Sequence, residues 1–222
     1  MLIIFDLDDT LIDTYSVTQI KLEDALNRMI AAGLRVPNVY EALHMLKRLD
    51  GSFMTARDTL SEFLELHDAD PQYLEIGLNE LYGEISPDVP VHALDQAHEV
   101  LAELSSSHKL VLVTVGKLER QMEKMKKAGI DSSVFSKIIV SEERNKKPHY
   151  EAVVDEFCAS PSEVMVCGDR IMLDLTPAKE LGFKTIQMRW GRGLVNFGNR
   201  RDVDFTISRL VEIKDILTNL NL

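Results

Sequence analysis

Acidic side chains lie directly after a short apolar run near the start of the chain. Leu2–Phe5 is followed by Asp6 and, two residues later, by Asp8. A carboxylate beside a buried apolar segment is costly unless it has a charged partner or a chemical role. One carboxylate can attack an electrophilic centre and form a covalent intermediate, and a second can transfer protons. The pair therefore indicates nucleophilic and acid–base chemistry at this point of the chain.

Polar side chains also follow three later apolar runs. Thr114 ends the second run, and Lys146 and Lys147 come shortly after the third. Asp169 ends the fourth, with Asp174 five residues further on. In an open parallel sheet, ligands bind at the carboxyl ends of the strands. We therefore expect these groups to converge with the first acidic pair on one edge of a sheet.

Several carboxylates that meet in a poorly solvated cleft repel one another, and a cation relieves the repulsion. A set of oxygen ligands selects a hard ion, and Mg²⁺ typically takes a few carboxylates, water and a substrate phosphate. A lysine and a threonine hydroxyl would bind the remaining phosphoryl oxygens. The residue types thus predict a Mg²⁺ site that handles a phosphate group.

Alternating strands and helices are expected to position these groups. Short continuous apolar runs predict strands buried on both faces of a parallel sheet. Helical periodicity lies between them, at residues 118–125, 150–157, 173–181 and 210–220. The alternation predicts an α/β fold with a doubly wound, mostly parallel sheet. The predicted strands are Leu2–Phe5, Leu110–Val113, Lys137–Val140, Val164–Cys167, Thr185–Met188 and, more weakly, Val203–Ile207.

The long interval between the first two strands has no strand pattern. A crossover between parallel strands needs only about 12 residues, so the interval is far longer than the sheet requires. We therefore predict a helical second domain at residues 15–90 and a core domain formed by residues 1–14 and 91–222. Apolar residues recur at helical spacing in three groups: Val39, Leu43 and Leu46; Leu60, Phe63 and Leu64; Leu74, Leu78, Leu81 and Ile85.

Composition limits the classes of partner. The 222 residues include 25 Lys and Arg against 36 Asp and Glu, a formal net charge of −11. Such a surface repels a phosphate backbone, so we expect no nucleic-acid partner. No apolar run approaches the roughly 18 residues of a membrane span, and the start lacks a signal-peptide pattern. We expect a cytoplasmic protein without a membrane partner, and the sequence leaves open whether it is a monomer or a dimer.

Taken together, the motifs resemble those of the haloacid dehalogenase (HAD) superfamily, most of whose members are phosphatases. The resemblance covers nearly the whole chain, and the predicted helical domain lies where this family inserts a cap domain. The four signatures are, in chain order, residues 3–11, Thr114, the pair Lys147–Pro148, and Gly168–Asp169 with Asp174.

The resemblance implies a mechanism and a metal site. Asp6 would attack phosphorus and form an aspartyl-phosphate. Asp8 would protonate the leaving group and then activate the water that hydrolyses the intermediate. The cofactor would be Mg²⁺, bound by Asp6, the backbone carbonyl of Asp8, Asp169 and Asp174.

The resemblance also implies a phosphate-binding group made of Thr114, Val115, Gly116 and Lys147. Thr114 and Lys147 would be catalytic together with the two acids. Lys147 is preferred to Lys146 because it directly precedes the proline. Val115 departs from the family pattern, since many relatives have Asn there, and only its backbone could contact phosphate.

The favoured hypothesis is a Mg²⁺-dependent hydrolase of small phosphate monoesters, whose partner is a small phosphorylated metabolite. Asp8 argues against a dehalogenase, since that chemistry needs no proton donor at this position. A sugar phosphomutase keeps both acids and remains an alternative. A non-enzymatic phospho-acceptor or interaction protein is a further alternative, although every motif residue is present. The sequence does not identify the phosphate ester or the residues of the helical domain that contact it.

Overall fold

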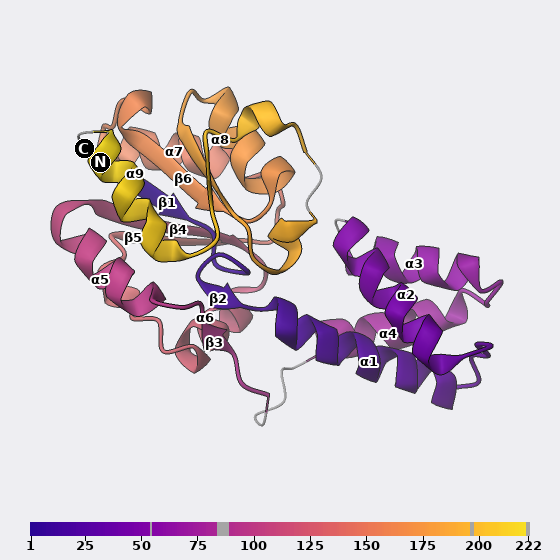
Figure 1. Ribbon diagram of the computed structural model, residues 1–222. Helices are drawn as coiled ribbons and strands as arrows, with labels where there is room; N and C mark the ends of the chain where they lie inside the picture. Colours follow the sequence, from indigo (N-terminus) through magenta and orange to yellow (C-terminus); the bar gives the residue numbers. More distant parts are fainter. Residues whose placement is uncertain (54, 84–88, 196–197, 221–222) are drawn as a thin grey trace. The chain divides into compact units, whose positions relative to one another are not determined.

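The computed structural model describes residues 1–53, 55–83, 89–195 and 198–220. The chain forms two compact units (Figure 1). Met1–Thr14 and Pro90–Leu222 form one, the core unit, and Tyr15–Val89 forms the other, the helical unit. Pro90, which we assigned to the insert, belongs to the core unit. Both segments of the core unit contribute strands to its main sheet.

The core unit is built on a sheet of six parallel strands in the order β5-β4-β1-β6-β7-β8. Each predicted apolar run supplies one strand, which confirms the α/β fold class. The central strand β1 pairs with β4 on one side and β6 on the other, which explains its unbroken apolar sequence. The strands are β1 (Leu2–Phe5), β4 (Lys109–Val115), β5 (Lys137–Ser141), β6 (Val164–Gly168), β7 (Lys184–Met188) and β8 (Phe205–Ile207).

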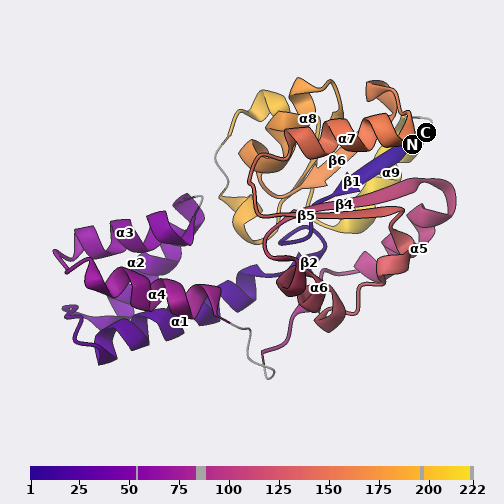
Figure 2. The ribbon, with the colours of Figure 1, turned by 180° about the vertical axis from the view of Figure 1, so that it is seen from behind.

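Helices cover both faces of this sheet (Figures 1 and 2). The predicted helix at 173–181 is divided into a π-helical turn, Ile171–Leu175, and the short helix α8. None of the helices in the described ranges has the length and apolar character needed to cross a membrane. The α-helices of the core unit are α5 (Ala97–Ser107), α6 (Leu118–Lys127), α7 (Lys147–Phe157), α8 (Thr176–Glu180) and α9 (Ile213–Asn219). Short 3₁₀ turns lie at Ser132–Val134, Pro161–Glu163, Gly191–Leu194, Arg200–Asp202 and Leu210–Glu212.

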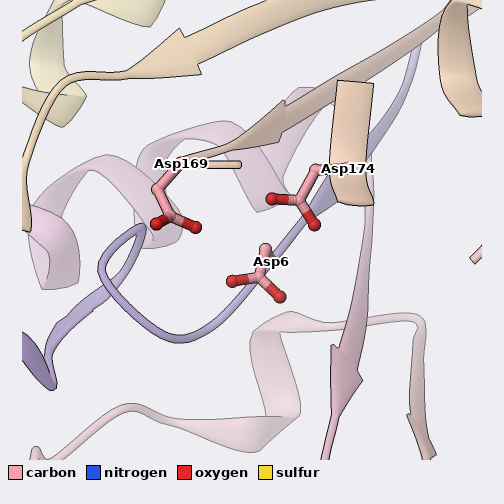
Figure 3. Close-up of side chains that lie close together, drawn as sticks. All are labelled: Asp6, Asp169 and Asp174. Atoms are coloured by element: carbon pink, nitrogen blue, oxygen red, sulfur yellow. The ribbon is translucent and has the colours of Figure 1, made fainter. Parts of the chain in front are cut away.

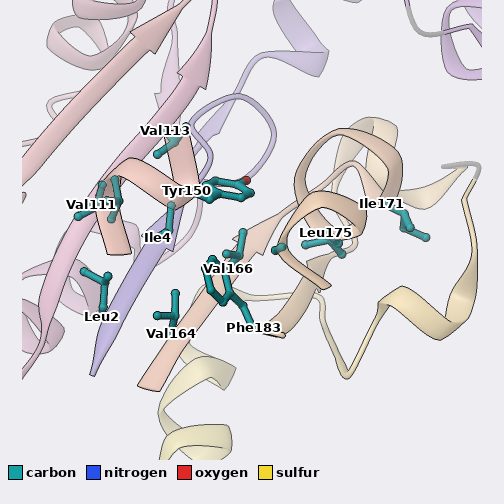
Figure 4. Close-up of a cluster of buried hydrophobic side chains, with 12 residues drawn as sticks. Leu2, Ile4, Val111, Val113, Tyr150, Val164, Val166, Ile171, Leu175 and Phe183 are labelled. Carbon is teal, nitrogen blue, oxygen red and sulfur yellow. The ribbon is translucent and has the colours of Figure 1, made fainter. Parts of the chain in front are cut away.

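A buried apolar cluster fixes the central strands against α7 and α8 (Figure 4). Ile4 of β1 and Val166 of β6 are fully buried in it, next to Tyr150 from α7. Complete burial of one large apolar side chain contributes about 1.5–3 kcal/mol. The cluster therefore holds the carboxyl ends of β1 and β6, and the side chains that follow them, in defined positions.

A two-stranded antiparallel pair lies where the chain leaves and re-enters the core unit. It consists of β2 (Ile12–Asp13) and β3 (His92–Ala93). The strands are too short to leave a pattern in the sequence, and we did not predict them. They join the two segments of the core unit on either side of the insertion.

The helical unit has an apolar core of its own, to which Leu26, Leu46 and Phe63 contribute. The Lys21 ammonium is buried and donates hydrogen bonds to the carbonyls of Glu80 (3.1 Å) and Gly83 (2.7 Å) at the end of α4. The predicted periodicity extended to Ile85, which lies outside the described residues. The helices are α1 (Tyr15–Ala31), α2 (Val39–Ser52), α3 (Ala56–Leu66) and α4 (Gln72–Tyr82).

Candidate active site

Two neighbouring strands deliver carboxylates to the same edge of the sheet. Asp6 directly follows β1, and Asp169 directly follows β6. The two strands are in register, and the N–H of Asp6 donates to the carbonyl of Cys167 at 2.9 Å. Parallel pairing thus places the first and the fourth signature side by side. Figure 3 shows their carboxylates facing the same space.

A third carboxylate reaches this space from the π-helical turn. Asp174 can approach the end of β6 because residue 168 is glycine. A Cβ atom on Gly168 would lie 2.5 Å from the Cβ of Asp174, which is closer than any real contact. The backbone N–H of Arg170 donates to Asp174 Oδ2 at 2.9 Å and orients the carboxylate. One oxygen from each of Asp6, Asp169 and Asp174 lies within 4.8 Å of the others (Figure 3).

A buried lysine joins this cluster. Lys146 Nζ donates to Asp6 Oδ1 at 2.5 Å and to Asp174 Oδ1 at 2.6 Å, and its side chain is only 2% exposed. Burial would lower the pKa of Lys146, but the carboxylates of Asp174 and Asp6 raise it well above its usual value. The Lys146 ammonium thus bridges the first and fourth signatures.

This geometry corrects the predicted choice of lysine. The partly exposed Lys147 pairs with Glu180 Oε2 at 2.8 Å and does not enter the cluster. Consecutive residues at the start of a helix project about 100° apart, so only one of two adjacent lysines can face the sheet edge. The proline that follows Lys147 marks the start of α7, but it does not indicate which of the two lysines faces the sheet edge.

The cluster carries more negative than positive charge. Burial raises the pKa of Asp6 to about 7, an effect that Lys146 opposes and Asp174 increases. Burial, with help from Asp174 and Asp9, also raises the pKa of Asp169 well above its usual range. A divalent cation would relieve this excess charge. The donor atoms are all carboxylate oxygens, and they fit a hard ion such as Mg²⁺.

The Asp8 side chain has other partners. Its oxygens accept hydrogen bonds from Lys124 Nζ at 2.8 and 2.9 Å and from Gln121 Nε2 at 3.1 Å. Burial would raise the pKa of Asp8, but the Lys124 charge and the hydrogen bonds from both donors bring it below its usual value. Two carboxylates only two residues apart therefore have different environments.

Of the residues at the end of β4, Thr114 is best placed for a role in the site. Its hydroxyl is buried and accepts a hydrogen bond from Gln121 Nε2 at 2.6 Å. Val115 is the last residue of the strand. The N–H of Gly116 donates to the carbonyl of Ser141 at 2.8 Å, so this amide has a backbone partner in the sheet. Gly116 has a φ of +150°, and a Cβ atom there would press against Gln121 at 3.2 Å.

Comparison with protein families identifies the chain. The model of the haloacid dehalogenase-like hydrolases matches residues 3–188, a range that contains all four signatures. The chain belongs to this family. The matched range includes the residues of the helical unit.

Curated relatives of this HAD-family chain carry one name. A protein of Methanocaldococcus jannaschii is 30% identical, over 98% of this chain and 97% of the relative. A protein of Pyrococcus furiosus is 26% identical, over 99% of this chain and 93% of the relative. Both are named glyceraldehyde 3-phosphate phosphatase. The similarity runs through both units.

Solved structures agree on the fold. A haloacid dehalogenase-like family hydrolase from Xanthomonas campestris superposes with a TM-score of 0.67 at 20% identity. The match covers 99% of this chain and 95% of the other. At this identity the likeness concerns the fold alone.

Two residues that the sequence did not predict, Gln121 and Lys124, contact predicted site residues. They lie one turn apart on α6 and face the end of β4 through their contacts with Thr114 and Asp8. The sequence contains an indication for Gln121, because this polar residue interrupts the apolar side of a helix that directly follows the second signature.

Proposed function

We propose that this HAD-family hydrolase is a Mg²⁺-dependent phosphatase that acts on small phosphate monoesters through an aspartyl-phosphate at Asp6. The buried convergence of Asp6, Asp169 and Asp174 with Lys146 carries the proposal. Such a charged cluster is expensive in a protein interior unless it binds an ion or performs chemistry.

Asp6, Asp169 and Asp174 would hold the ion, with the backbone carbonyl of Asp8 as a further ligand. When bound, Mg²⁺ would neutralise negative charge on the carboxylates and on the phosphate oxygens. Lys146 would remain beside Asp6 and bind a phosphoryl oxygen together with the Thr114 hydroxyl. Positioning and charge neutralisation account for most of the catalysis of phosphoryl transfer.

In the first step, an Asp6 carboxylate oxygen forms a bond to phosphorus as the bond between phosphorus and the ester oxygen breaks. Asp8 gives its proton to the departing oxygen, which leaves as an alcohol. The placement of the two side chains fits this division of roles, because Asp6 faces the ion-binding space and the Asp8 carboxylate faces α6.

In the second step, water attacks the phosphorus of the aspartyl-phosphate. The Asp8 carboxylate takes a proton from the water as the bond between phosphorus and the Asp6 oxygen breaks. Inorganic phosphate leaves, Asp6 is a free carboxylate again, and Asp8 is protonated for the next cycle.

The helical unit would serve as a cap that limits access to small substrates. Its place in the chain supports this role, since the chain leaves the core unit directly after the loop of the first signature. Glyceraldehyde 3-phosphate is the leading candidate substrate, because relatives that align over nearly the whole chain carry that name.

A panel of phosphorylated metabolites, assayed for release of inorganic phosphate with and without Mg²⁺, tests the proposal. We expect Mg²⁺-dependent release, with glyceraldehyde 3-phosphate among the best substrates, and inactivation by a chelator. Formation of an isomeric sugar phosphate without free phosphate would favour a mutase. Equal activity of wild type and Asp6→Asn would contradict the assignment of the nucleophile.

A further inference from the structure

Two side chains of α6 hold the Asp8 carboxylate. Lys124 Nζ lies 2.8 Å from Oδ1 and 2.9 Å from Oδ2, so the ammonium contacts both oxygens. Gln121 Nε2 donates to Oδ2 at 3.1 Å. The two donors are three residues apart on one helix, a spacing that places their side chains on the same face.

Gln121 also links Asp8 to the end of β4. Its amide nitrogen has two hydrogens and lies within hydrogen-bond distance of both Asp8 Oδ2 and Thr114 Oγ1. The residue is 1% exposed, so it has little freedom to exchange these partners for water. The missing side chain of Gly116 leaves the space that Gln121 occupies. The orientation of Asp8 is thereby tied to the residue that ends the neighbouring strand.

These contacts oppose a competing attraction. Asp8 lies two residues from Asp6, near a cluster that contains the Lys146 ammonium and three carboxylates that could hold a cation. A carboxylate without partners of its own would be drawn toward those positive charges. The Lys124 ammonium, whose side chain is only 11% exposed, offers a competing positive charge from α6. Asp8 can then remain separate from the groups that bind the ion.

We propose that Gln121 and Lys124 are positioning residues that hold the Asp8 carboxylate in the direction from which it exchanges a proton with the ester oxygen. This inference rests on the proposed function and adds to it the two groups that orient the acid–base residue. Neither group needs to touch the substrate.

Comparing substrates with different leaving groups distinguishes a positioning role of Gln121 and Lys124 from a purely structural one. An alkyl phosphate releases a strongly basic alkoxide, which needs the proton from Asp8. The anion released by 2,4-dinitrophenyl phosphate is weakly basic and leaves without one. The steps up to departure of the leaving group determine kcat/KM, so misplacing Asp8 should lower kcat/KM for the alkyl ester selectively. General acid catalysis typically accelerates a reaction by about 10²–10⁴-fold, so this is the largest decrease in kcat/KM to be expected for the alkyl ester.

The experiment uses the full chain with Mg²⁺ and compares kcat/KM for 2,4-dinitrophenyl phosphate and for the alkyl phosphate that the wild type hydrolyses best. Lys124→Met and Gln121→Met remove the donors and keep the length of the side chains. Lys126→Met, on the exposed side of the same helix, is the matched control. Asp8→Asn gives the effect of losing the proton donor itself, and Lys124→Arg tests rescue by another cation.

We expect the alkyl-to-aryl ratio of kcat/KM to fall about tenfold or more in Lys124→Met and Gln121→Met, in the direction set by Asp8→Asn. Lys126→Met should keep the wild-type ratio, and Lys124→Arg should recover part of it. Because the ratio is measured within each variant, a smaller fraction of folded protein lowers both rates equally and does not imitate the effect.

An unchanged ratio in Lys124→Met and Gln121→Met, beside a lowered ratio in Asp8→Asn, would overturn the inference and leave the proposed function intact. An unchanged ratio in Asp8→Asn would remove Asp8 as proton donor and overturn both. The two failures are therefore distinguishable.

Discussion

The Lys146 ammonium lies 2.5 Å from the carboxylate of Asp6, and both groups are buried at the end of the central strand. The same ammonium reaches Asp174 at 2.6 Å. One cation therefore bridges two signatures that are far apart in the sequence. Its removal would leave two buried carboxylates without this partner.

We expect Lys146→Ala to lower kcat/KM by about 100-fold or more, because a phosphoryl-binding charge next to the nucleophile is lost. Breaking a buried ion pair should also lower the free energy of unfolding by about 3–5 kcal/mol. Lys147→Ala is the matched control and should stay within about threefold of wild type, since exposed ion pairs contribute little. Steady-state kinetics and urea unfolding check both variants. A larger loss of activity in Lys147→Ala than in Lys146→Ala would contradict the placement of the two lysines.

Gly168→Ala should weaken Mg²⁺ binding. The added Cβ would overlap Asp174, so the π-helical turn must shift and carry this carboxylate away from Asp6. Overpacking of this kind costs about 1–3 kcal/mol of stability. Titration calorimetry with Mg²⁺ measures the affinity. Gly77→Ala, in the core of the helical unit, is the control that perturbs packing elsewhere. Unchanged Mg²⁺ affinity in Gly168→Ala would contradict the claim that Asp174 binds the ion only because Gly168 lets it approach the end of β6.

Stabilisation by Mg²⁺ should increase with pH. The pKa of Asp6 rises from 3.8 to about 7 on folding, so between these values the folded protein binds a proton more tightly than the unfolded chain does. The free energy of unfolding of the metal-free protein therefore receives a contribution that decreases as pH rises through this window and is constant above it. Asp169 contributes in the same direction.

Mg²⁺ competes with these protons, so its binding is favoured where the carboxylates are ionised. We expect a saturating addition of Mg²⁺ to raise the melting temperature more at about pH 8 than at about pH 5, as measured by calorimetry. In Asp6→Asn this difference should shrink. An equal increase at both pH values in wild type would show that the cluster is not the site of binding.

Much of the fold follows from local sequence patterns. Each strand of the sheet appears as an apolar run because both faces of the sheet are covered, and Leu2–Phe5 was predicted to the residue. The meeting of Asp6 with Asp169 also follows from the sequence, since parallel strands end at one edge. Asp174 was expected there from the spacing of the fourth signature, but the π-helical turn that carries it left no recognisable pattern.

The sequence did not predict in which direction several side chains of the site point. Lys146 and Lys147 are adjacent and identical, and only the backbone of the loop before α7 decides which one turns inward. Gln121 and Lys124 acquire their importance from the way α6 lies against the end of β4. Hydrophobic periodicity specifies the apolar side of such a helix, but it does not tell which polar residues at its border reach a neighbouring strand.

The central claim is that Asp6 is transiently phosphorylated, and mass spectrometry of acid-quenched protein tests it most directly. Asp8→Asn should slow hydrolysis of the intermediate, so this variant is mixed with Mg²⁺ and 2,4-dinitrophenyl phosphate and quenched within one turnover. We predict one phosphoryl group on the peptide that contains Asp6, and none when Asp6→Asn is added to the same variant. Release of dinitrophenolate with no phosphoryl group on that peptide, or with the group on another residue, would contradict the account.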